Sequence, residues 1–95
     1  MTMIKRAELV IHGDVQGVGF RGFTRRHAEL LGVKGWVRNR PDGTVEAMIE
    51  ASPAAVDRMI DILRTGPRFS TVDRLETVLE ESDENARFSE FSVKF

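Results

Sequence analysis

The hydrophobic period of this chain switches repeatedly between that of a strand and that of a helix, and this order constrains the fold most strongly. Alternation with period two predicts a strand, whereas apolar residues at i, i+3, i+4 and i+7 predict an amphipathic helix. Glycine, proline and serine mark the boundaries between segments. We predict strands at 7–12, 33–38, 44–51, 72–80 and 88–95, and helices at 20–31 and from Ser52-Pro53 to Gly66-Pro67.

The order strand, helix, strand, strand, helix, strand, followed by a terminal strand, predicts an α+β fold. Two helices are best placed on one face of a mostly antiparallel sheet, as in the ferredoxin-like sandwich. Residues 1–95 are expected to form one domain, because single domains commonly contain about 100–150 residues. A right-handed crossover makes the strands on either side of the first helix parallel. Residues 13–21 and Asn39, which follow these strands, should therefore meet at one edge of the sheet.

The apolar positions also predict which faces are buried. The sets expected to face the core are Phe20, Phe23, His27, Leu30 and Leu31; Val45, Ala47, Ile49 and Ala51; Val56, Met59, Ile60 and Leu63; and Leu75, Thr77 and Leu79. The later acidic segment, from Glu80 to Asn85, has neither the spacing of metal ligands nor that of a catalytic carboxylate pair. We expect its last five residues, 81–85, to form a solvated loop.

The net charge of −1 hides an uneven distribution. Eight basic against three acidic residues give residues 1–40 a charge of +5, and six against twelve give residues 41–95 a charge of −6. An anion site in the first half is therefore expected, but a pI of about 6.1 argues against a dedicated nucleic-acid-binding protein. The absence of cysteine excludes disulfides and thiol nucleophiles. With no signal peptide or membrane-length apolar run in the sequence, a cytoplasmic location is expected. We also expect the protein to be a monomer.

The segment Gly13-Asp14-Val15-Gln16-Gly17-Val18-Gly19 connects the first strand to the first helix. It supplies no Ser, Thr, Asp or Asn at the expected cap position, so the first N–H groups of the helix need another acceptor. Glycines allow successive N–H groups to line a concavity that suits a phosphate. Arg21 opposes the helix dipole, and a bound anion would reverse this penalty. The alternative is a glycine-rich turn beside a solvated arginine.

Two longer motifs identify a resemblance. The stretch 13–21 resembles the first signature of the acylphosphatase family, and 35–45 (Gly-Trp-Val-Arg-Asn-Arg-Pro-Asp-Gly-Thr-Val) resembles the second. The segment that begins at Gly66-Pro67 and the closing Phe-x-Val-x-Phe of 91–95 also resemble segments of this family. The resemblance therefore covers nearly the whole chain. It implies a ferredoxin-like fold and hydrolysis of small acyl phosphates without metal or cofactor.

The resemblance also implies roles for individual residues. Arg21 matches the arginine that binds the phosphoryl group, and Asn39 matches the asparagine that positions the attacking water. The phosphate cradle corresponds to the loop residues Val15, Gln16, Gly17, Val18, Gly19 and Phe20. The leaving carboxylate needs no general acid, because the pKa of its conjugate acid is about 4. This is consistent with a motif that contains no obvious histidine or glutamate dyad.

Two positions depart from the family pattern. Asp14 lies where the family often has a basic or neutral residue, and an acid beside a phosphate would repel it unless its side chain points away. Ala51 replaces a glycine that commonly closes the second signature. An alanine with positive φ would be strained, so we expect the end of the hairpin to differ locally.

Three other functions are compatible with parts of the sequence. A catalytically idle anion-binding module would use the same loop. An RNA-binding sandwich would use the sheet face, with Trp36 and Phe88 as a stacking surface. The amino-terminal module of hydrogenase-maturation carbamoyltransferases is a further relation, and the end of this sequence at Phe95 argues against it. The motifs leave open which acyl phosphate is the physiological substrate.

Overall fold

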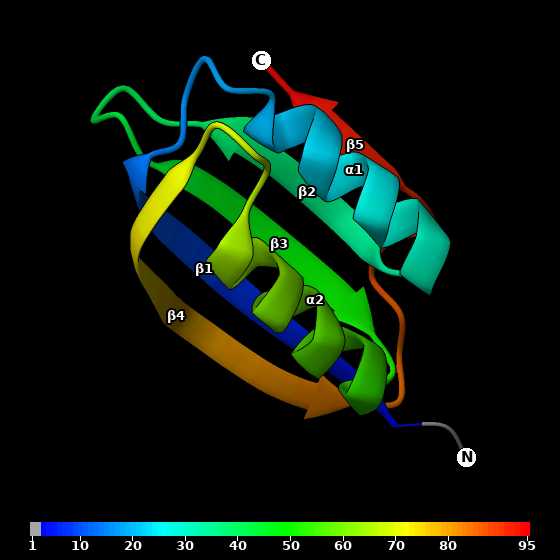
Figure 1. Ribbon diagram of the computed structural model, residues 1–95. Helices are drawn as coiled ribbons and strands as arrows, with labels where there is room; N and C mark the ends of the chain where they lie inside the picture. The colour runs from blue at the N-terminus through cyan, green and yellow to red at the C-terminus, as the bar shows by residue number, and fades with distance from the viewer. Residues whose placement is uncertain (1–2) are drawn as a thin grey trace.

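The computed structural model describes residues 3–95 and contains helices and strands in the predicted order (Figure 1). They form one five-stranded sheet in the order β4-β1-β3-β2-β5, with both helices on the same face. Among the strand pairs of the described residues, β2 and β5 are parallel and the others antiparallel. The predicted ferredoxin-like α+β sandwich is therefore confirmed. The elements are β1 (Ile4–Asp14), α1 (Phe20–Leu31), β2 (Lys34–Asn39), β3 (Val45–Ala51), α2 (Pro53–Thr65), β4 (Thr71–Asp83) and β5 (Phe91–Lys94).

The core lies between the helices and the sheet. The prediction for β3 is confirmed, because Val45, Ala47 and Ile49 are fully buried and face this core. The prediction for α2 is also confirmed, because its buried row consists of Val56, Met59 and Leu63. Burying one such aliphatic side chain stabilises the fold by about 1.5–3 kcal/mol. These central elements hold the ends of β1 and β2 in place.

The buried face of α1 agrees only in part with the predicted one: Phe20 is buried and Phe23 and Leu31 pack against the core, as predicted. Phe20, Thr24 and Ala28 are buried, whereas Leu30 is 75% exposed. These three residues lie four apart, and the small side chains of Thr24 and Ala28 let the helix approach the sheet closely. The Thr24 hydroxyl donates a hydrogen bond to the Phe20 carbonyl oxygen at 2.8 Å, which satisfies its polar group inside the helix. This row turns Arg21 away from the core.

The strand β4 is longer than predicted and contains a β-bulge. Glu8 pairs with Leu79, but its neighbour Leu9 pairs with Thr77, so the extra residue is Val78. A bulge shifts the alternation of side chains. Leu79 therefore lies on the opposite face from Thr77, and their predicted common face is wrong. Because β4 continues to Asp83, residues 81–83 belong to the strand.

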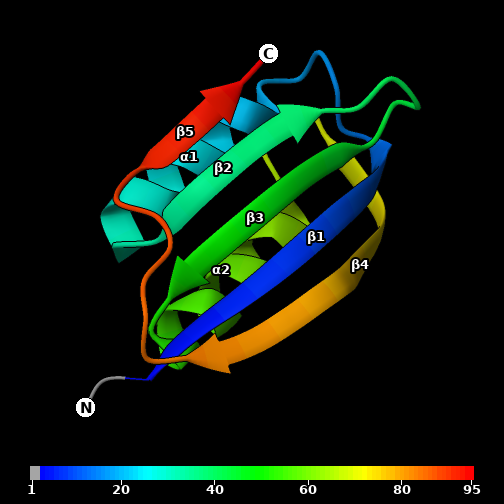
Figure 2. The ribbon, with the colours of Figure 1, turned by 180° about the vertical axis from the view of Figure 1, so that it is seen from behind.

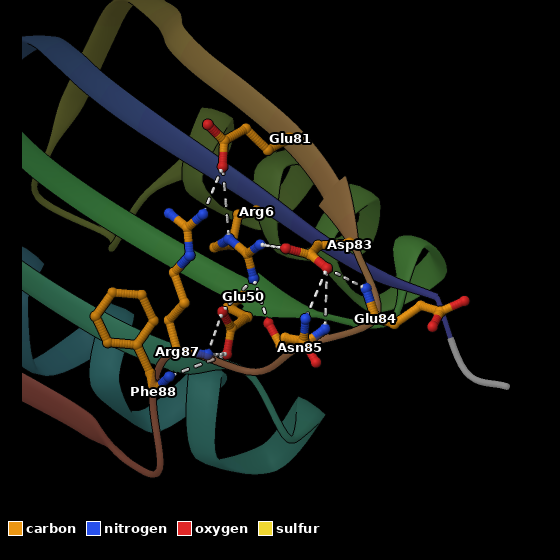
Figure 3. A network of polar contacts seen from close by, with 8 residues as sticks. All are labelled: Arg6, Glu50, Glu81, Asp83, Glu84, Asn85, Arg87 and Phe88. Atoms are coloured by element: carbon orange, nitrogen blue, oxygen red, sulfur yellow. Dashed lines mark hydrogen bonds and ion pairs between the residues drawn. The ribbon is translucent and has the colours of Figure 1, made fainter.

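The acidic segment 81–85 is largely exposed, as predicted, but it is also tied to a buried ionic network (Figure 3). Arg6 and Glu50 are cross-strand neighbours, joined at 2.8 Å, with 3% and 2% of their side chains exposed. Asp83 approaches the same guanidinium at 3.1 Å, and the Asn85 carbonyl oxygen accepts from it at 2.9 Å. A buried charge is costly unless it is paired, so Arg6 holds these acidic groups in place.

Glu50 in turn anchors the segment that leads into β5. Its carboxylate accepts hydrogen bonds from the backbone N–H groups of Arg87 and Phe88 (Figure 3). Burial alone would raise the pKa of Glu50, but the bonds from Arg6 and these two N–H groups outweigh it and lower the pKa. The network thus connects the ends of β1, β3 and β4 to the last strand.

Within residues 3–95, neither helix has the length and apolar character needed to cross a membrane.

Candidate functional site

A cleft of about 440 Å³ lies between the start of α1 and the ends of β2 and β5. The β1–α1 loop, the end of β2 and the end of β5 all lie at the same end of the sheet (Figure 1). Since β1 and β2 are both antiparallel to β3, they run in the same direction, and the predicted meeting of residues 13–21 with Asn39 is confirmed. The lining consists of Val15, Gly17, Gly19, Phe20, Arg21, Gly22, Arg25, Asn39, Val93 and Phe95.

The start of α1 lacks a side-chain cap. Gly19 occupies the N-cap position with φ of 79°, and Gly17 has φ of 75°, a backbone region that favours glycine. By contrast, α2 is capped by Ser52, whose hydroxyl accepts from the N–H of Ala55 at 3.3 Å. The first N–H groups of a helix have no partner inside it. Those of α1 therefore lie beside the cleft with the positive end of the helix dipole, which favours an anion.

Arg21 extends from the first turn of α1 into this cleft. One Nη donates to the Lys94 carbonyl oxygen at 3.2 Å, and the guanidinium lies 4.7 Å from the centre of the Phe95 ring. Asp and Glu are absent from the described lining of the cleft. The positive charge is thus oriented by a carbonyl and an aromatic ring, neither of which neutralises it, and the remaining N–H donors can bind an anion.

Asn39 is the last residue of β2 and lies half-buried in the wall of the cleft. Its Oδ1 atom is buried and has no hydrogen-bond partner among the described residues. A buried acceptor without a partner costs about 1–3 kcal/mol. A donor that binds beside Asn39 would recover part of this cost.

Two residues of the predicted phosphate cradle do not line the cleft. Gln16 turns its side chain toward the β2–β3 turn, where Nε2 donates to the carbonyl oxygens of Arg40 at 2.7 Å and Thr44 at 2.9 Å. Val18 packs against the hydrophobic core. The structure brings together the other predicted residues, Val15, Gly17, Gly19, Phe20, Arg21 and Asn39.

The closing strand supplies the part of the cleft that sequence reasoning missed. Val93 and Phe95 line it, and Lys94 orients Arg21 through its carbonyl oxygen. The alternation of Phe91, Val93 and Phe95 predicts that their side chains share one face. It does not predict which strand lies beside them. Only the parallel pairing of β5 with β2 brings them beside Asn39.

The two departures from the family pattern have simple structural outcomes. Asp14 is exposed, pairs with Thr71 of β4 and does not line the cleft. The expected strain at Ala51 is absent, because positive φ angles in the described residues occur only at glycines. Ala51 instead pairs with Lys5 as an ordinary strand residue.

The face of the sheet opposite the helices, here called the open face, is seen in Figure 2. It carries both charge signs, since Arg38 is paired with Glu46. The cationic groups of Arg38 and Lys94 both lie over the Trp36 ring, with 4.5 Å between Lys94 Nζ and the ring centre. Phe88 and Trp36 border a separate hollow of about 280 Å³. Residues 3–95 hold no group of three or more potential metal-ligating side chains.

Known proteins resemble this chain over most of its length. A family model described as acylphosphatase matches residues 7–93. An acylphosphatase of Bordetella avium is 46% identical over 84 residues, covering 88% of this chain and 87% of the relative. One from Thermococcus kodakarensis is 53% identical over 78 residues, covering 82% and 86%. A crystal structure of acylphosphatase from Bacillus subtilis superposes with a TM-score of 0.86 at 29% identity, covering 96% of this chain and 99% of the other.

Proposed function

Because the chain belongs to the acylphosphatase family, and is thus a hydrolase of acyl phosphates, we propose that the cleft at the start of α1 is its active site. The observation that carries this proposal is the meeting of an uncapped helix start, Arg21 and Asn39 in one cleft. The catalytic unit is the single domain expected over residues 1–95. The shared sheet and core support this assignment.

The phosphoryl group binds where the positive elements converge. Backbone N–H groups of the loop and of the first turn of α1 face its oxygens, and the Arg21 guanidinium makes a forked contact with two of them. Phosphoryl transfer depends mainly on positioning and on stabilising charge on these oxygens. Both tasks are within the reach of residues that line the cleft, so the reaction proceeds without a metal ion.

Asn39 holds the water that attacks phosphorus, with Oδ1 accepting one of its hydrogens. The bond between phosphorus and the acyl oxygen breaks, and the carboxylate leaves with the bonding electron pair. One proton of the water passes to a phosphoryl oxygen of the substrate. Because the conjugate acid of the leaving group has a pKa of about 4, no general acid is required.

Hydrolysis in the presence of a chelator tests this proposal. We expect purified protein with excess EDTA to release phosphate from acetyl phosphate and benzoyl phosphate well above the rate in buffer. Equal rates with and without protein would contradict the catalytic role of the cleft. Phosphate binding without turnover would favour an idle anion-binding module, and salt-dependent RNA binding unaffected by Arg21→Ala would favour the sheet-face alternative.

Replacing Asn39 with alanine is expected to lower kcat for acetyl phosphate by about 100-fold, because the attacking water loses its orientation. The inhibition constant of inorganic phosphate should change by less than about threefold, since the phosphoryl group is held by Arg21 and the N–H groups. Lys34→Ala, at the exposed start of the same strand, is the matched control. A variant with normal kcat, or one that loses kcat and phosphate affinity equally, would reject this role.

A further inference from the structure

Arg25 is a second cation in the wall of the cleft. It lies four residues after Arg21 on α1, a spacing that places the two side chains on the same helix face, with Cβ atoms about 5–6 Å apart. A phosphoryl group held by the loop and by Arg21 leaves Arg25 without a role.

The Arg25 guanidinium forms an exposed ion pair with Glu29, which orients it. Its Nε donates to Glu29 Oε1 at 2.9 Å, one turn further along α1. Glu29 itself does not line the cleft. Since Nε is occupied, the two Nη groups remain as a fork of donors, and 57% of the Arg25 side chain is exposed. A forked guanidinium matches a carboxylate or phosphate in geometry as well as in charge.

The cleft also has room for more than a phosphoryl group. Its volume of about 440 Å³ is within the range of about 300–1,000 Å³ typical of sites for whole small molecules. Away from the phosphate-binding loop, one side of the cleft wall is apolar and the other is charged. Val93 of β5 and Phe95, which follows this strand, form an apolar side, and Arg25 is the further charged group along α1.

We propose that Arg25 selects acyl phosphates whose acyl group carries a second anion, a carboxylate or a phosphate, about one helical turn from the phosphoryl group. The acyl portion lies between Arg25 and the apolar side formed by Val93 and Phe95. This inference rests on the proposed function of the same cleft and specifies the class of substrate that it prefers.

Three aromatic acyl phosphates test the selection: 3-carboxybenzoyl, 3-phosphonobenzoyl and 3-methylbenzoyl phosphate. They place a carboxylate, a phosphonate or a neutral methyl group at the same ring position, where none can attack the acyl phosphate. The readout is the ratio of kcat/KM for each anionic substrate to kcat/KM for the methyl substrate. Comparing this ratio between variants cancels the intrinsic reactivity of each substrate.

We expect Arg25→Gln to lower this ratio by roughly 3- to 10-fold, the effect of one partly exposed charge contact. The carboxylate and phosphonate substrates report separately which anion Arg25 prefers. Arg26→Gln is the matched control, because it removes the same charge from a neighbouring exposed position that does not line the cleft. Its ratios should equal those of the wild type.

The outcomes separate the two proposals. If the wild-type protein hydrolyses neither benzoyl phosphate nor any of the three substrates, the proposed function fails; if it hydrolyses benzoyl phosphate but none of the three, only the role of Arg25 is overturned. If it hydrolyses all three and Arg25→Gln leaves both ratios unchanged, the proposed function stands and the role of Arg25 is overturned. An equal loss of selectivity in Arg26→Gln would also overturn it, because the effect would then come from the general field of the helix.

Discussion

Replacing Arg21 with alanine is expected to lower kcat/KM for acetyl phosphate by about 1,000-fold. In the proposed function the guanidinium makes a forked contact with the phosphoryl oxygens, and arginines that stabilise charge in phosphoryl transfer contribute about 10³–10⁵ to the rate. The measurement is phosphate release under subsaturating substrate. Arg26→Ala, on the same helix but outside the cleft, should retain wild-type activity. Retention of more than a tenth of the activity in Arg21→Ala would reject its assignment.

The same substitution should also weaken inhibition by inorganic phosphate, which distinguishes Arg21 from Asn39. It should not unfold the protein. A cation in the first helical turn opposes the helix dipole by roughly 0.3–1 kcal/mol, and its removal offsets the lost contacts with Lys94 and Phe95. Arg21→Lys restores the charge without the fork, so only part of the activity should return.

Replacing Glu50 with alanine is expected to have the largest effect on stability, lowering the free energy of unfolding by about 3–5 kcal/mol. The substitution leaves the Arg6 guanidinium buried without its closest carboxylate and removes the acceptor of the Arg87 and Phe88 N–H groups. Urea unfolding followed by circular dichroism measures the loss. Glu80→Gln is the control. Glu80 forms an ion pair with Lys5, but 48% of the Glu80 side chain is exposed, so this pair should contribute less than about 1 kcal/mol to stability.

The acid dependence of stability provides an independent readout of this network. The pKa of Glu50 is lowered in the folded state, and the N–H groups of Asn85 and Glu84 lower the pKa of Asp83. Carboxyl groups with a lowered folded-state pKa stabilise the fold above their ordinary pKa of about 4 and lose this contribution as the pH falls. The free energy of unfolding should therefore decrease below about pH 4.5, and Glu50→Ala should flatten this decrease. An unchanged slope would show that Glu50 is not the group that titrates.

Local chemistry explains which parts of the site were predictable. The missing cap and the glycines around Gly17 lie within one short segment, so the sequence alone predicts a concavity there. Asn39 was placed beside it by the right-handed crossover rule, which concerns two consecutive strands. The cleft wall formed by Val93 and Phe95 depends on strand order at the sheet edge, which no local pattern specifies.

The buried network illustrates a second limit. Alternation in β3 correctly directs Glu50 to the open face, where a carboxylate is usually solvated. Its burial depends on Arg6 from β1 and on the segment that crosses after Asp83, which are distant in sequence. Similarly, the apolar stripe of α1 suggested Leu30, whereas close packing selected the smaller Thr24 and Ala28. Composition along one element does not reveal how closely its neighbours approach.

The hydrogen bond between Arg21 and the Lys94 carbonyl oxygen has a consequence for when the cleft can form during synthesis. The two residues are 73 positions apart, so the ribosome makes Lys94 roughly 4–15 s after Arg21 at a rate of about 5–20 residues per second. During this interval the nascent chain can contain the glycine loop and α1, but the cleft lacks the wall formed by Val93 and Phe95, and Arg21 lacks its carbonyl partner. The proposed phosphate site therefore cannot be complete before Lys94 has been made.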